Sequence, residues 1–217
     1  YTLSLHDALP ISPLARLSRR QFVGGVAALS LGSLADLASA AEVSPEVPVP
    51  ASERLGRLLS ERRSLWLLRG DEEIKATWWS AAQGYDRDEY LKVCWLLRDV
   101  QASRVMPIDR RLLDLLAGVQ TWLAANGKLG PMLVHSGYRS LATNRRTEGA
   151  ALDSKHLVGK AADVSIPGIS NVKLAGMSQS LGMGGTGFYV GRGFVHVDTG
   201  DERLWIDQGR RPKTPAG

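Results

Sequence analysis

The chain has 217 residues, with 27 Lys and Arg against 22 Asp and Glu, so its formal net charge is +5. Hydrophobic residues make up 44% and charged residues 23%, which excludes a fully disordered chain, a collagen-like chain and a polytopic membrane protein. The positive excess is small and spread along the chain, which argues against a nucleic-acid-binding protein. A single cysteine, Cys94, excludes an intrachain disulfide and a metal site built from several thiolates.

The N-terminal forty residues are expected to be a targeting segment. Residues 1–12 do not begin with Met and are expected to be an unreliable start of the sequence. Arg19 and Arg20 then precede an apolar stretch at 22–34 and a possible cleavage site at 38–40, a pattern that predicts a twin-arginine-type secretory signal. The apolar stretch is shorter than the roughly 20 residues of a membrane-spanning helix. We therefore expect a protein of the periplasm or cell envelope that has no membrane contact after cleavage, with an uncleaved signal anchor as the alternative.

The rest of the chain predicts a linker, one domain and a tail. Residues 41–52 are rich in Pro, Val and Ser and predict an extended linker. Residues 53–206 carry the apolar periodicity of a folded domain. The polar segment 207–217 predicts a flexible tail.

Within the domain, helices come first and strands dominate the second half, which favours the α+β class. Asp86 and Glu89 have the spacing of a capping box, and Asn126-Gly127 predicts the end of the second helix. The elements predicted in chain order are a hairpin of strands 64–69 and 74–79, a helix from 86 to 100, a helix from 109 to 125, strands 132–136 and 160–166, a helix over 171–181, and strands 188–190 and 194–198.

Side chains that could carry chemistry gather in three stretches, at 136–140, 154–163 and 194–200. His156, Asp163 and His196 offer two imidazoles and one carboxylate. Such a set leaves one tetrahedral position open, which is typical of a catalytic zinc site. His196 and Asp198 are two residues apart in a predicted strand and therefore share a face, opposite the core. Spacing alone leaves the metal site open, because a His and an Asp seven residues apart are common by chance.

The pattern Ser-x-His-x-x-Gly-x-Ala-x-Asp at 154–163, followed by His196-x-Asp198, resembles the zinc peptidases of the M15 type. It is most similar to the branch known as DUF882, which includes murein endopeptidases, and Ser-Gly-Tyr-Arg-Ser at 136–140 also matches that branch. The resemblance covers about residues 60–206. It implies a compact α+β domain with a small antiparallel sheet flanked by helices, like D-Ala-D-Ala metallopeptidases and the Hedgehog signalling domain. It also implies one zinc ion held by His156, Asp163 and His196, and cleavage of peptide cross-links in peptidoglycan.

Two further roles follow from the resemblance and from side-chain chemistry. Arg139 is expected to bind a substrate carboxylate or the developing oxyanion, because a guanidinium suits anions, and Ser136 to assist in substrate binding. Several M15 relatives carry a Glu three residues before the last zinc histidine, but here that position is Gly193. Asp198 is therefore expected to be the general base, and the alternative role is to hold an imidazole.

The sequence thus predicts an exported zinc metallopeptidase that acts on peptidoglycan peptides, most simply as an endopeptidase on cross-links. Two alternatives remain open at this stage. One is a D,D-carboxypeptidase or dipeptidase that trims short cell-wall peptides. The other is a non-catalytic zinc domain that binds cell-wall peptide, which the loss of the glutamate at Gly193 would permit.

Overall fold

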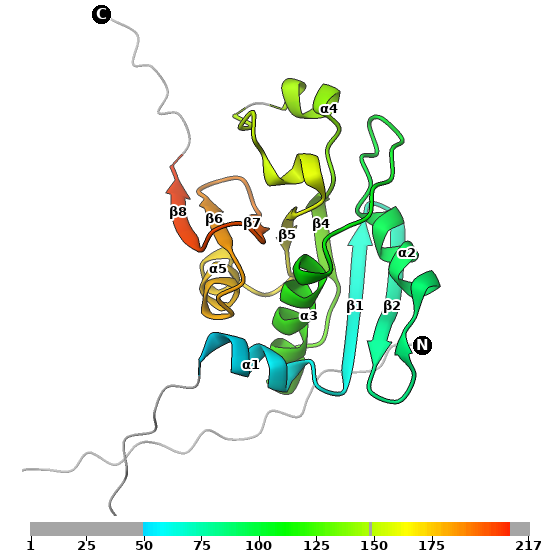
Figure 1. Cartoon of the computed structure of the whole chain (residues 1–217). Coiled ribbons are helices and arrows are strands. Elements are labelled where there is room, and N and C mark those ends of the chain that lie inside the picture. Colours follow the sequence, from blue (N-terminus) through cyan, green and yellow to red (C-terminus); the bar gives the residue numbers. More distant parts are fainter. Residues whose placement is uncertain (1–49, 148, 209–217) are drawn as a thin grey trace, which may run out of the picture. The chain divides into compact units, whose positions relative to one another are not determined.

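The computed structural model of the protein describes residues 50–147 and 149–208 (Figure 1). The predicted signal and most of the predicted linker and tail lie outside these residues. The helices are α1 (Ala51–Leu58), α2 (Arg87–Leu96), α3 (Arg110–Ala125), α4 (Leu141–Arg146), the 3₁₀ turn η2 (Lys155–Val158) and α5 (Asn171–Ser180). The strands are β1 (Arg62–Arg69), β2 (Glu72–Ser80), β3 (Gly84–Tyr85), β4 (Met132–Ser136), β5 (Ala161–Ser165), β6 (Gly185–Tyr189), β7 (Val195–Asp198) and β8 (Arg203–Asp207).

The strands of this part of the chain form one eight-stranded sheet in the order β3-β2-β1-β4-β5-β7-β6-β8. The predicted α+β class is confirmed. The expectation of a small antiparallel sheet is corrected, because the sheet has eight strands and the pairs β1·β4 and β6·β8 are parallel. The chain passes through α2 and α3 between β2 and β4, and a connection of that length allows β4 to run alongside β1 in the same direction.

The hydrophobic core lies between the sheet and its helices. α2 packs against β2, α3 against β1 and α5 against β6 (Figure 1). The apolar spacing predicted for α3 is confirmed by a buried stripe on that helix, made of Leu112, Leu113, Leu115, Leu116, Val119 and Leu123. Cys94 is buried in the same core, as predicted. Among the described residues, no helix combines the length and the apolar character needed to cross a membrane.

Element boundaries differ from the prediction where a side chain redirects the backbone. α2 ends at Leu96 instead of Val100, because Asp99 accepts hydrogen bonds from the backbone N–H groups of Gln101 and Ala102 and so closes a turn. α1 begins at Ala51, inside the last residues of the segment expected to be a linker. At the other end, β8 includes the first residue of the expected tail.

The alternation of side chains in β5 and β7 separates the core from the functional face. Ala162, Val164, Val195 and Val197 all belong to the hydrophobic core. Their neighbours Asp163, His196 and Asp198 therefore point to the opposite face of the sheet. Asp163 pairs with His196 across the antiparallel register of β5 and β7, so the sheet itself places these two side chains side by side.

Candidate metal centre

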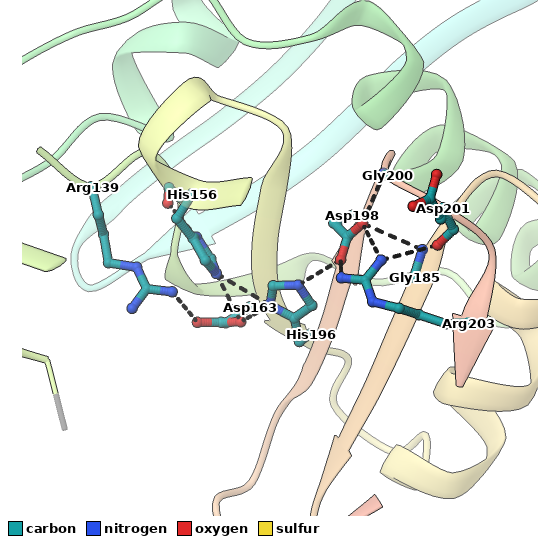
Figure 2. Close-up of polar contacts among 10 residues, drawn as sticks. Arg139, His156, Asp163, Gly185, His196, Asp198, Gly200, Asp201 and Arg203 are labelled. Atoms are coloured by element: carbon teal, nitrogen blue, oxygen red, sulfur yellow. Dashed lines mark hydrogen bonds and ion pairs between the residues drawn. The ribbon is translucent and has the colours of Figure 1, made fainter. Parts of the chain in front are cut away.

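Three side chains that are distant in the sequence meet on this face of the sheet. Asp163 comes from β5, His196 from β7, and His156 from η2, which precedes β5. Figure 2 shows the three pointing toward one another. The His156 Nε2 atom lies 3.2 Å from His196 Nδ1 and 3.3 Å from Asp163 Oδ1, and the last two atoms are 2.9 Å apart. Within the described residues they form a buried group able to hold a metal ion.

The partners of the other ring nitrogens decide which atoms face the centre of this triangle. His156 Nδ1 lies 2.6 Å from the carbonyl oxygen of Gly137, and His196 Nε2 lies 3.0 Å from Asp198 Oδ2. A carbonyl and a carboxylate only accept hydrogen bonds, so these two nitrogens carry the protons of the neutral rings. His156 Nε2 and His196 Nδ1 then present lone pairs to each other and to the carboxylate of Asp163. A metal ion at the centre, or a proton on His196 Nδ1, would stabilise such a cluster of acceptors.

The donor set fits zinc in both chemistry and size. Two imidazole nitrogens and one carboxylate oxygen are common zinc ligands in catalytic sites that keep a fourth position open. Ligand atoms about 2.0–2.1 Å from a tetrahedral zinc lie about 3.3 Å from one another. The three separations of 3.2, 3.3 and 2.9 Å are close to this value. These residues could therefore hold the ion with only small side-chain movements.

Burial and the neighbouring charges shift the pKa values of the three side chains in different directions. Burial alone would lower the pKa of His196, but the hydrogen bonds and charges of Asp163 and Asp198 outweigh it and raise that pKa, so a metal ion would displace a proton from this ring. His156 is fully buried, and burial lowers the pKa of its imidazole below the usual range, which favours the neutral ring. Burial alone would raise the pKa of Asp163, but its interactions with His156 and His196 outweigh it and lower that pKa. The carboxylate is therefore ionised, as a metal ligand must be.

Arg139 lies beside the triangle, on the far side of Asp163 (Figure 2). Its Nη2 is 4.0 Å from Asp163 Oδ2, and its backbone N–H donates to the carbonyl oxygen of His156 at 3.1 Å. Its buried Nε finds no hydrogen-bond partner within the described residues. A guanidinium that is largely buried and incompletely paired next to a candidate metal centre is well placed to bind an anionic group.

A cleft of about 780 Å³ opens over this face. Its lining includes Ser136, Arg139, Asp163 and His196, so the structure brings the predicted substrate-binding residues to the same cavity as two of the three predicted ligands. The lining also has an aromatic part beside His196: the rings of Tyr189 and Trp205 lie 6.5 Å apart, centroid to centroid, and Trp205 lies 5.3 Å from His196.

Asp198 lies next to His196, one of the three candidate ligands. It contacts the Nε2 edge of His196, whereas the triangle is on the Nδ1 edge of that ring. Its side chain is fully buried, and both oxygens accept hydrogen bonds, from the backbone N–H of Gly200 and from Arg203 among others. The general-base role stays a prediction, and this placement fits the alternative role, a carboxylate that orients the imidazole.

Gly193 and Arg203 both bear on what the sequence predicted for this site. Gly193 lies exposed in the turn between β6 and β7 with φ +72°, a left-handed conformation that favours glycine. Arg203 was not predicted. The apolar, β-prone run at 204–206 could have indicated a strand, but nothing in the sequence pairs Arg203 with Asp198.

Comparisons with known proteins agree on one family. A family model described as peptidoglycan L,D-endopeptidase MepK matches residues 59–205. The peptidoglycan L,D-endopeptidase MepK of Escherichia coli strain K12 is 36% identical over 165 residues, which cover 73% of this chain and 87% of that protein. The protein of the same name from Shigella flexneri matches to the same extent. A probable peptidoglycan L,D-endopeptidase MepK from Haemophilus influenzae is 35% identical over 130 residues, or 58% of this chain and 69% of that protein.

Proposed function

The chain belongs to the family of the peptidoglycan L,D-endopeptidase MepK, and from this membership we propose that it is an exported zinc peptidase that hydrolyses peptide cross-links of peptidoglycan. The observation that carries the zinc assignment is the convergence of three possible ligand atoms, His156 Nε2, His196 Nδ1 and Asp163 Oδ1, within 3.3 Å of one another. A zinc ion bound there would supply a water of lowered pKa and would polarise the scissile carbonyl.

The chain's own residues would bind and orient the substrate around that centre. Arg139 would hold a substrate carboxylate or the carbonyl oxygen as it gains negative charge, because its guanidinium borders Asp163 and keeps an unpaired Nε. Ser136, in the lining of the same cleft, would contribute a hydroxyl to substrate binding. Asp198 would keep the proton of His196 on Nε2, so that Nδ1 stays available for the metal.

Digestion of purified murein sacculi, followed by chromatographic separation of the fragments, tests the activity. The proposal predicts cross-linked dimers converted to monomers by the zinc-loaded protein. Release of D-Ala alone would instead indicate a carboxypeptidase. Tight binding to sacculi without any new fragment, with zinc supplied, would indicate a non-catalytic domain.

We also propose export by the twin-arginine route to the periplasm or cell envelope. The support is the pattern of Arg19 and Arg20 before an apolar stretch, together with membership of a family named for its action on peptidoglycan. Replacing both arginines by lysine should leave the protein in the cytoplasmic fraction, whereas unchanged export would contradict the route.

A further inference from the structure

We propose that Arg203, on strand β8, is a positioning residue for the metal centre: it holds Asp198, which in turn holds His196. The inference rests on the proposed function. Arg203 Nη1 donates to Asp198 Oδ1 at 3.1 Å, and Nη2 donates to Oδ2 at 2.7 Å. Oδ2 also accepts from His196 Nε2 at 3.0 Å, so the three side chains form one continuous series that ends at the triangle (Figure 2).

A glycine in the intervening strand makes this contact possible. β6 lies between β7, which carries Asp198, and β8, which carries Arg203. A Cβ at Gly185 would lie 2.4 Å from Arg203 Nη1 and 2.6 Å from Asp198 Oδ2. Any side chain at this position would therefore separate the guanidinium from the carboxylate, and only glycine lets the two strands on either side of β6 join through their side chains.

The next row of the sheet repeats the arrangement. Gly187 of β6 pairs with His196 on one side and with Trp205 on the other. A Cβ at Gly187 would lie 2.4 Å from the indole ring, which occupies the space above the glycine and reaches within 5.3 Å of the His196 ring. The Arg203 guanidinium lies 4.9 Å from the same indole. β8 thus supports His196 at its Nε2 edge through Asp198 and beside its ring through Trp205.

The effect of Arg203 is one of orientation more than of charge. A guanidinium and a carboxylate together are neutral, and their two parallel hydrogen bonds fix the plane of the carboxylate. With that plane fixed, Oδ2 stays on His196 Nε2 and the lone pair of Nδ1 points to the triangle. Residues that orient a metal-ligating histidine typically contribute about 10–100-fold to metal affinity.

A double-mutant cycle on zinc affinity, measured for the full chain by competition with a chromophoric chelator, tests the proposal. Arg203→Met should weaken zinc binding about tenfold or more. Arg203→Lys keeps the charge but not the paired hydrogen bonds, so its zinc affinity should lie between those of the wild type and Arg203→Met. If Arg203 acts through Asp198, Arg203→Met should have little effect in an Asp198→Asn background. An equal loss in both backgrounds, or no loss in either, would overturn the proposal.

Two further variants separate positioning from general stability. Gly185→Ala keeps both charged side chains in the protein but forces them apart, so it should also weaken zinc binding. Gly176→Ala is the control, because a Cβ there meets nothing within 4 Å, and it should leave zinc binding unchanged. Arg98→Met removes a similar pair, in which Arg98 contacts Glu72 with both nitrogens and lies over Trp95, away from the centre, and should keep the wild-type affinity. With Co²⁺ in place of zinc, the visible spectrum should change for Arg203→Met and stay unchanged for Arg98→Met.

The outcomes distinguish this inference from the proposed function. A wild-type chain that binds no zinc would overturn both. A wild-type chain that binds zinc and cleaves sacculi, together with an Arg203→Met variant of unchanged affinity and spectrum, would overturn this inference alone. If Arg203→Met does not fold, Arg203→Lys takes its place in the cycle and Gly185→Ala carries the same expectation.

Discussion

Asp163 and His196 face each other across two adjacent antiparallel strands, with Asp163 Oδ1 2.9 Å from His196 Nδ1. The register of β5 and β7 thus fixes two of the three candidate ligands before any ion is bound. The third, His156, comes from a short 3₁₀ turn and is oriented by its hydrogen bond to Gly137. The centre therefore combines a rigid pair on the sheet with one ligand whose position depends on a neighbouring loop.

Removing an imidazole should remove the metal. We expect His196→Ala to lose bound zinc and all cleavage of sacculi, because two remaining ligands do not hold a tetrahedral ion tightly. Elemental analysis of the purified protein measures the first effect. His135→Ala is the matched control for zinc content, since the exposed His135 bonds to Ser165 Oγ and takes no part in the triangle. A His196→Ala protein with one zinc per chain would contradict the assignment.

Gly137 should tolerate no side chain. A Cβ there would lie 2.3 Å from the backbone oxygen of Leu97, which also accepts the N–H of Tyr138 at 2.7 Å. Because backbone atoms cannot swing aside, we expect Gly137→Ala to displace the loop that holds His156, to cost roughly 1–3 kcal/mol of unfolding free energy and to weaken zinc binding. Gly56→Ala in α1, with nothing within 4 Å, is the control. Wild-type stability and affinity of Gly137→Ala would show that the loop can adjust.

Arg139 should act on the substrate and leave metal binding intact. Arg139→Lys keeps a positive charge but loses the planar pair of donors, so we expect kcat/KM on cross-linked muropeptides to fall about 10–100-fold. Zinc content should stay at the wild-type level, because Arg139 contacts Asp163 only at 4.0 Å. Loss of zinc together with activity would instead assign Arg139 to the support of the ligand.

Asp99, which accepts a hydrogen bond from the backbone N–H of Ser140, should make the free energy of unfolding depend on pH. Burial alone would raise the pKa of Asp99, but hydrogen bonds from Thr143, the backbone of Ser140 and neighbouring amides lower it from 3.8 to about 2. The ionised carboxylate therefore stabilises the fold above about pH 4, by about 2 kcal/mol, and this contribution is lost as the pH falls through about 2.

Urea unfolding of Asp99→Asn against wild type checks this linkage. The variant should be less stable by about 2 kcal/mol at pH 7, and the difference should shrink toward zero near pH 2. A difference that does not change between these two pH values would contradict the linkage.

Much of the site could be predicted from local patterns. The strands that carry Asp163 and His196 were predicted because alternating apolar residues mark their core-facing side, and His156 was found through the spacing of its motif. The capping residue of α2 was also predicted: Asp86 accepts the N–H groups of Asp88 and Glu89. The capping box is incomplete, however, since Glu89 instead accepts from the backbone N–H of Thr77 in β2.

The parts that were missed depend on contacts between distant segments. β6 was predicted to begin at 188, whereas it begins at Gly185, because its glycines give no hydrophobic alternation. These glycines leave room for the side chains of Arg203 and Trp205, which lie over them. No local sequence pattern predicts such a contact between strands. The sequence could not choose between the two roles of Asp198 for the same reason. A spacing of two residues from His196 predicts a shared face of the strand, but not which ring nitrogen the carboxylate contacts.

The central claim is that one zinc ion binds between His156, Asp163 and His196. Anomalous diffraction from crystals of the zinc-loaded protein, recorded on both sides of the zinc absorption edge, tests it most directly. The account predicts a single strong peak about 2.0–2.2 Å from His156 Nε2, His196 Nδ1 and Asp163 Oδ1. A peak bound to other side chains, or an empty triangle in a protein that cleaves peptidoglycan, would contradict it.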